Sequence, residues 1–177
     1  SELVREAHSM GFTEPDPRED LSGEDVRRKI LILARAAGFP LESGSVDVET
    51  LVPPALESLN CADALDQLHL LDERLLAELE KARGDGNSLR FVARLQDGSA
   101  TVRLESIRPD NPLAGGRGTD NRVAIWSDRY REQPLVIQGP GAGATVTAAA
   151  LLDDVLRLNA LSRAGFLGAS TASVTLA

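Results

Sequence analysis

Aromatic residues, cysteine and long hydrophobic runs are all scarce in this sequence of 177 residues. Phe, Tyr and Trp make up 3% of it, so a hydrophobic core must be built from Leu, Val, Ile and Ala. Cys61 is the single cysteine; it cannot form an internal disulfide and has no cysteine or histidine partners for a metal site. No apolar run approaches the roughly 18 residues of a membrane-spanning helix. We therefore expect neither a metal nor a membrane partner.

Positive charge is also in short supply. The formal net charge is −8, and the arginines are scattered among acidic residues, which argues against the basic surface that nucleic acids or anionic membranes require. No signal-peptide pattern opens the chain, and we expect a cytoplasmic protein. The hydrophobic content of 42% fits one globular domain with its own core. Because a helical pattern is already under way at Ser1, we expect a segment of a larger polypeptide.

Apolar residues recur at helical spacing in the first half of the chain. Gly11 ends the first such segment, and Gly38 ends another whose N-cap we predict at Ser22. Residues 13–20 contain two prolines and are predicted to be a loop. Residues 46–52 are predicted to form a short strand that two prolines end. Helices are predicted over residues 2–10, 22–37 and 68–83.

The second half changes to the alternating pattern of β-strands. Residues 89–95 and 100–107 flank Asp97-Gly98, a dipeptide typical of tight hairpin turns. Two further strands are predicted over residues 122–127 and 135–138. They are followed by a long helix over residues 145–164.

Helices first and a strand meander later indicate an α+β fold. We expect a largely antiparallel or mixed sheet with helices packed on one face. The predicted domain covers residues 1–168, and the small polar residues 169–177 are expected to form a flexible tail.

Acidic residues gather where the predicted loop meets the following helix. Asp25 and Lys29 are four positions apart and therefore face the same way on a helix. Carboxylates at such a junction can hold a substrate ammonium while a lysine acts as acid or base. On the pattern alone, acids that favour a helix N-terminus and a surface ion pair are the more common explanation. The charged residues concerned are Glu14, Asp16, Glu19, Asp20, Glu24, Asp25 and Lys29.

Lysine is rare here, with only Lys29 and Lys81 among 19 basic residues. Lysine can give up a proton whereas arginine effectively cannot, so its use at position 29 weakly favours chemistry. A second segment of interest is the glycine-rich stretch from Gly139 to Gly143. Its glycines allow close approach of a ligand, and the helix start after it attracts anions. A tight strand-to-helix turn explains the pattern equally simply, and neither a GxGxxG fingerprint nor a Walker loop is present.

Together the two segments resemble homoserine dehydrogenase. The first, GFTEPDPREDLSGEDV from Gly11 to Val26, is similar to the family's signature, and Arg28-Lys29 follows it. The second, PLVIQGPGAGATVTAA from Pro134 to Ala149, is similar to the family's closing strand, glycine loop and final helix. The resemblance covers most of the chain, although its middle is less distinctive.

The resemblance implies an oxidoreductase that interconverts L-homoserine and L-aspartate 4-semialdehyde with NADP or NAD. It implies a role for each matching position. These are general acid or base for Lys29, an acid beside the same site for Asp20, homoserine binding for Glu14 and Asp25, and contact with the nicotinamide cofactor for Gly11, Glu14 and Gly143.

The same resemblance implies what this chain lacks. The family's Rossmann domain is expected upstream, so most of the cofactor site would be absent and the fragment inactive alone. A homodimer through the sheet is implied, which makes a non-catalytic dimerisation module the alternative function. A dehydrogenase for a related semialdehyde or hydroxy acid is a second alternative, which the signature argues against. The ending resembles the short form of the enzyme or the C-terminal part of an aspartokinase–homoserine dehydrogenase fusion, and we favour the fusion.

Overall fold

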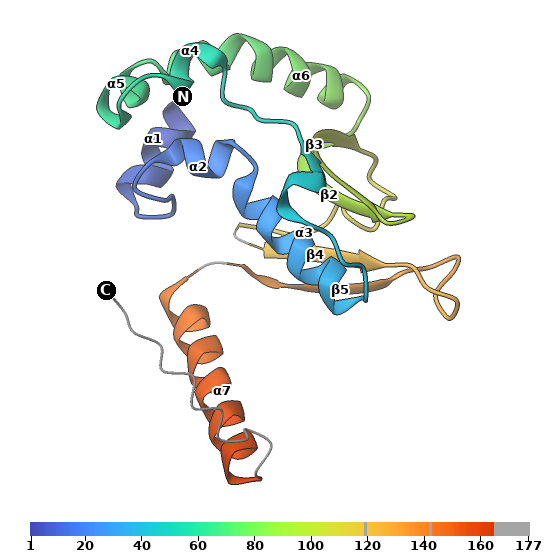
Figure 1. Cartoon of the computed structure of the whole chain (residues 1–177). Helices are drawn as coiled ribbons and strands as arrows, with labels where there is room; N and C mark the ends of the chain where they lie inside the picture. The colour runs from blue at the N-terminus through green and yellow to red at the C-terminus, as the bar shows by residue number, and fades with distance from the viewer. Residues whose placement is uncertain (119, 142, 165–177) are drawn as a thin grey trace. The chain divides into compact units, whose positions relative to one another are not determined.

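A computed structural model describes residues 1–118, 120–141 and 143–164 and divides into two compact units, each considered by itself (Figure 1). The first unit comprises Ser1–Gly115 with Val123–Val136, and the second comprises Gly116–Arg122 with the described residues from Ile137 onward. The predicted tail, residues 169–177, lies outside the described residues. The elements are α1 (Glu2–Ser9), α2 (Pro17–Leu21), α3 (Glu24–Ala36), the 3-10 turn η1 (Ser43–Ser45), β1 (Val46–Val48), α4 (Pro54–Glu57), α5 (Cys61–Asp66), the 3-10 turn η2 (Leu68–Leu71), α6 (Asp72–Gly84), β2 (Ser88–Gln96), β3 (Ser99–Ile107), β4 (Asp120–Ile125), β5 (Leu135–Pro140) and α7 (Ala144–Arg163).

The predicted α+β fold and mixed sheet are confirmed. β2 and β3 form an antiparallel hairpin around Asp97-Gly98, both of which have positive φ, as a tight hairpin turn requires. β1 pairs with the other edge of β3 in parallel, which gives the order β1-β3-β2. The expectation of a single sheet was wrong for the described residues, since β4 and β5 form a separate two-stranded sheet. A long connection that contains turns separates β3 from β4, and β4 pairs with β5 and not with β3.

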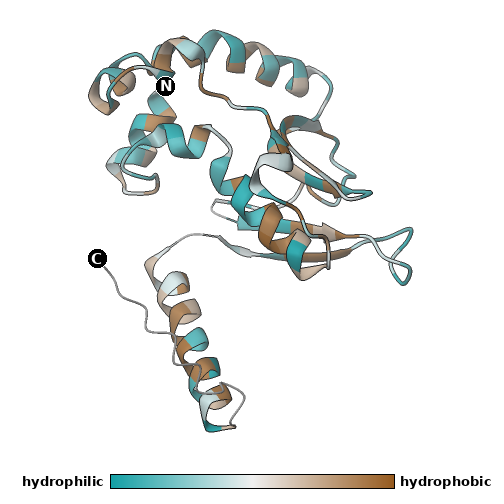
Figure 2. Ribbon diagram, in the orientation of Figure 1, coloured by the Kyte–Doolittle hydropathy of each residue, from teal (hydrophilic) through white to brown (hydrophobic). Residues whose placement is uncertain are grey.

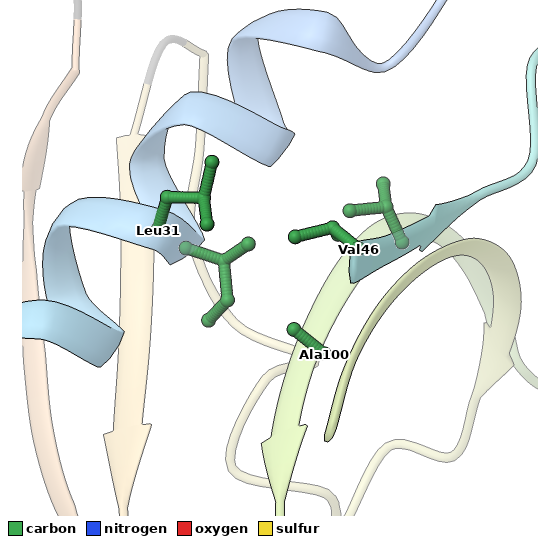
Figure 3. Packing of buried hydrophobic residues seen from close by; sticks show 5 residues of the cluster. Leu31, Val46 and Ala100 are labelled. Atoms are coloured by element: carbon green, nitrogen blue, oxygen red, sulfur yellow. The ribbon is translucent and has the colours of Figure 1, made fainter. Parts of the chain in front are cut away.

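Helix α3 covers one face of the three-stranded sheet. Its Ile30 and Leu31 are buried against Val46, Ala100 and Val102, and Figure 3 shows Leu31 directed towards Val46 and Ala100. These side chains are small or branched, as the shortage of aromatic residues predicted. This packing orients the whole of α3.

A second cluster joins the short helices of the first unit. Its buried members come from the segment before α4, from α4 itself and from η2, and α1 and α2 contribute Val4 and Leu21 at its edge. Arg5 of α1 also donates to the carbonyl oxygen of Leu65 at 2.9 Å. The helices α1, α2, α4 and α5 therefore form one helical layer (Figure 1). The buried residues of the cluster are Val52, Leu56, Leu68 and Leu71.

Two predictions for the signature segment were wrong. Residues 17–20 of the predicted loop belong to α2, because Asp16 accepts a hydrogen bond from the Arg18 N–H as N-cap and Pro17 suits the first helical position. Ser22 ends α2 and is not the N-cap of α3; that position is held by Gly23. The predicted strand over residues 46–52 is shortened to β1, and the predicted helix over 68–83 begins as η2.

Helix α7, which belongs to the second unit, matches its predicted position closely. All of its described residues are exposed, although it is rich in leucine and alanine along its length (Figure 2). At about 100° per residue, the apolar side chains occupy more than half of its circumference. Within the described residues of its own unit this helix has an apolar surface without cover. The large apolar residues concerned are Val146, Leu151, Leu152, Val155, Leu156, Leu158 and Leu161.

Gly23 generates a first prediction. It is buried with φ of +82°, and a Cβ placed on it would lie 2.8 Å from Cζ of Phe91 and 2.9 Å from Cγ1 of Val48. Gly23→Ala combines left-handed backbone strain with overpacking, and we expect it to lower the free energy of unfolding by roughly 2 to 4 kcal/mol. Urea denaturation of the chain measures this loss.

Two glycines serve as matched controls for that variant. Gly38 has φ of +89° with no atom within 4 Å of a Cβ, so Gly38→Ala carries the backbone strain alone, about 1 to 2 kcal/mol. Gly44 has neither feature, and Gly44→Ala should be close to neutral. Equal losses for positions 23 and 38 would show that the contact with the sheet is unimportant.

Candidate active site

The signature loop leaves α1 at Gly11. This residue has φ of +72°, and the N–H of Phe12 donates to the Ala7 carbonyl at 2.9 Å, which is how a glycine commonly ends a helix. His8 Nδ1 lies 3.0 Å from Oγ1 of Thr13, so this histidine contacts the start of the loop from within α1. Nothing lies within 4 Å of a Cβ placed on Gly11, and the backbone there is open to a ligand.

Glu14 and Asp20 are brought together across the loop and α2. The backbone N–H of Glu14 donates to Oδ2 of Asp20 at 3.0 Å. One oxygen of Asp20 thus holds the backbone at position 14, while the carboxylate of Glu14 is left exposed. The two residues place two negative charges within six positions of each other in the sequence.

Asp25 and Lys29 form the predicted ion pair on α3. Lys29 Nζ lies 2.7 Å from Oδ2 of Asp25, and the two side chains are 46% and 50% exposed. An exposed pair at this helical spacing contributes only about 0.3 to 0.5 kcal/mol to stability. Its main consequence is to hold the lysine amine in one place beside a carboxylate.

The structure brings these four residues together as two pairs and not as one cluster. Among the described residues, no hydrogen bond or ion pair joins Lys29 to Glu14 or Asp20. Two hollows of the first unit, of about 420 and 570 Å³, are lined by residues of α6, β2, β3 and the segment after β3. Neither hollow includes a residue of the signature.

The glycine loop lies in the second unit and is supported there by the start of β4. A Cβ on Gly141 would lie 2.1 Å from Nδ2 of Asn121, so a larger residue would require the Asn121 side chain to move. Gln138 donates to Oδ2 of Asp120 at 2.8 Å; a backbone hydrogen bond from Arg117 and this side-chain bond lower the pKa of Asp120. Gly143, the N-cap of α7, has φ of +128° with open space around it.

Known proteins resemble this chain over most of its length. The family model described as homoserine dehydrogenase matches residues 1–156. The chain belongs to the homoserine dehydrogenase family. It is 48% identical over 159 residues to the bifunctional aspartokinase/homoserine dehydrogenase 2 of Escherichia coli K12, a match that covers 89% of this chain and 20% of that protein.

Two further similar proteins extend this comparison. The homoserine dehydrogenase of Paracoccidioides brasiliensis is 38% identical over 162 residues, covering 89% of this chain and 44% of that protein. A crystal structure of a Candida auris protein of unknown function matches with a TM-score of 0.80 at 39% identity, over 88% of this chain and 44% of that one. The chain therefore spans between 20% and 44% of the length of the similar proteins named here.

Within this homoserine dehydrogenase signature, Asp16 and Arg18 are the residues whose role the sequence did not reveal. Arg18 contacts both carboxylate oxygens of Asp16, through Nε at 3.0 and 3.1 Å and a terminal nitrogen at 2.6 Å. The side-chain hydrogen bond from Arg18 lowers the pKa of Asp16, outweighing the opposing effect of burial. The Asp-Pro pair was the available sign, since an aspartate before a proline is typical of a helix start.

This ion pair predicts a pH-dependent stability. Because the folded-state pKa of Asp16 lies below the unfolded value of about 3.9, its contribution is present above that value and is lost as the pH falls through the folded-state pKa. Asp16→Asn keeps a capping side chain but loses the charge, and we expect it to cost about 1 kcal/mol near pH 7. The difference from the unsubstituted chain should shrink as the pH falls below about 3.9 and through the folded-state pKa of Asp16.

Thermal or urea unfolding at a series of pH values, from about 7 down to about 2.5, follows this difference as Asp16 is protonated. Asp66→Asn, which neutralises an exposed carboxylate of α5, is the matched control and should show little change with pH. A difference for Asp16→Asn that is constant across the range would contradict the role of its charge.

Proposed function

We propose that this chain supplies the catalytic and substrate-binding part of an oxidoreductase that interconverts L-homoserine and L-aspartate 4-semialdehyde in the cytoplasm. The observation that carries the proposal is the Lys29–Asp25 pair, 2.7 Å apart, on the helix that follows the family signature. Membership of the homoserine dehydrogenase family supports the reaction class. So exposed an ion pair stabilises α3 very little. A contribution to stability therefore does not explain why Lys29 and Asp25 are paired here.

In the proposed reaction, Lys29 acts as the general acid or base. When the aldehyde is reduced, negative charge develops on its oxygen, and the Lys29 ammonium donates a proton to it; in the reverse direction the amine accepts the proton of the homoserine hydroxyl. Asp25 keeps Nζ in position, and it binds homoserine together with Glu14, whose exposed carboxylate suits the substrate ammonium. Asp20 fixes Glu14 through the backbone bond and adds a second negative charge.

The residues present fit the edge of a nicotinamide cofactor, NADP or NAD, which accepts or donates the hydride when bound. Gly11 and Gly143 each leave open space beside the backbone, and the start of α7 has no side-chain cap, which suits a polar ligand. No pyrophosphate-binding fingerprint occurs in the sequence. We assign most of the cofactor site to a further domain.

Within the described part of its own unit, α7 has an uncovered apolar surface. A helix that is apolar around more than half of its circumference is normally buried, so we infer that another part of the protein covers it. The identity of 48% to the fused E. coli enzyme, against 38% to the P. brasiliensis enzyme, favours fusion to an aspartokinase.

Lys29 generates the central prediction for the full-length protein. Removing the proton donor by Lys29→Ala should lower kcat roughly 10²- to 10⁴-fold, and Lys29→Arg should be similarly impaired because a guanidinium does not exchange its proton. Homoserine-dependent reduction of NADP followed by absorbance measures the rate. Lys81→Arg, at the other lysine of the chain and on the exposed side of α6, is the matched control and should retain full activity. Wild-type kcat in either Lys29 variant would contradict the proposal.

The isolated chain should self-associate without turning over homoserine. We propose a homodimer through the sheet, supported by large exposed apolar side chains on β4, β5 and the residues beside them. Light scattering should report twice the monomer mass of 18.9 kDa, while the dehydrogenase assay on the same sample stays at background. A monomer would contradict the dimer, and measurable turnover would contradict the need for a further domain. The exposed residues are Ile125, Trp126, Leu135 and Ile137.

A further inference from the structure

Arg18 makes contacts that have no part in the proposed proton transfer or in the proposed dimer. One of its terminal nitrogens donates to two backbone carbonyls, that of Leu56 at 2.6 Å and that of Leu59 at 2.7 Å. The rest of the guanidinium contacts Asp16. The side chains of Arg18 and Asp16 are only 18% and 28% exposed, so water screens this pair less than the other ion pairs of the signature.

The Leu56 carbonyl lies in the single turn of α4, and the Leu59 carbonyl lies two residues beyond its end. Carbonyls at a helix end lack partners in the regular helical pattern, and a cationic side chain placed there can hydrogen-bond to them. The side chain of Leu56 is completely buried in the core of the helical layer. Arg18 therefore ties α2 to a part of the molecule that cannot move without opening a core.

A further contact holds the same loop from the same side. The thiol of Cys61, at the start of α5, lies 3.6 Å from the carbonyl oxygen of Pro15, and Pro17 is fully buried. The loop is thus fixed at residues 15 to 18, in the middle of the segment between Glu14 and Asp20. Those two residues depend on this anchor, because the bond between the Glu14 N–H and Asp20 spans it.

We propose that Arg18 is a positioning residue for substrate binding: by anchoring α2 to the end of α4 it holds Glu14 and Asp20 in their working geometry. The inference rests on the proposed function, in which Glu14 binds the homoserine ammonium and Asp20 holds the backbone of Glu14. Arg18 touches no reacting atom and acts through the backbone of the loop. A displacement of the carboxylates by about 1 Å is enough to cost up to roughly 10²-fold in rate.

The test uses the full-length protein with Arg18→Gln and Arg18→Lys. The glutamine variant loses the charge, whereas the lysine variant keeps the charge but cannot contact Asp16 and both carbonyls with one planar group. We expect kcat/KM for homoserine to fall roughly 10- to 100-fold in Arg18→Gln, mainly through KM, and less in Arg18→Lys. Hydrogen exchange at the Glu14 amide should accelerate in the same order. Arg74→Lys, which replaces an arginine bound to Glu49 and Glu78 outside the loop, should change neither quantity.

The readouts separate the possible failures. Variants that are folded by circular dichroism at the assay temperature, with wild-type KM, would overturn the positioning role whether or not exchange accelerates. Slow, wild-type exchange at Glu14 would overturn the anchoring step itself. Absence of homoserine turnover in the unsubstituted full-length protein would instead overturn the proposed function, and with it the substrate assigned to this loop, while the exchange measurement would still decide the anchor.

Discussion

The packing of α3 against the β1-β3-β2 sheet is the constraint on which the candidate site depends. With about 3.6 residues per turn, Ile30, Leu31 and Ala34 share one side of the helix, and all three are buried. Asp25 and Lys29 then project from the other side. Their exposure follows from what the helix must bury, and a lysine amine held by a carboxylate is left accessible to a substrate.

The two pairs of the site belong to two different packing clusters. Asp25 and Lys29 are placed by the cluster of α3 and the sheet, whereas Glu14 and Asp20 are placed by the helical layer through α2. The clusters meet between Leu21, which packs on the helical layer, and Gly23, which approaches Phe91 and Val48 of the sheet. The Leu21 carbonyl also accepts a hydrogen bond from the N–H of Leu51 at 3.0 Å. This short junction therefore fixes the relation between the two pairs, and the close contacts at Gly23 are the reason to expect that a side chain is poorly tolerated there.

The sequence predicted the elements whose pattern is local. The β2–β3 hairpin, α7 and the end of α1 follow from alternation, helical spacing and glycine positions, and each was found near its expected bounds. The parallel pairing of β1 and the role of Arg18 could not be predicted, because both depend on partners more than thirty positions away. The start of α3 was misplaced since Ser22 and Asp25 imitate a capping pattern, while the closeness of the sheet at position 23 decided the geometry. Lys29, Glu14, Asp20, Asp25, Gly11 and Gly143 came from family resemblance, and their roles stay predictions.

In the function proposed above, this chain supplies only part of the active site around Lys29. Lys29 and Asp25 are 46% and 50% exposed, the glycine loop leaves open backbone at Gly143, and α7 has an apolar surface without cover from the residues of its own unit that the structure describes. Exposed leucines favour association, and an exposed ion pair adds little stability. In the function proposed above, a further domain of the full-length protein covers the Lys29–Asp25 pair. Exclusion of water would then strengthen the electrostatic interactions of this pair. In that proposal the pair forms one wall of the active site.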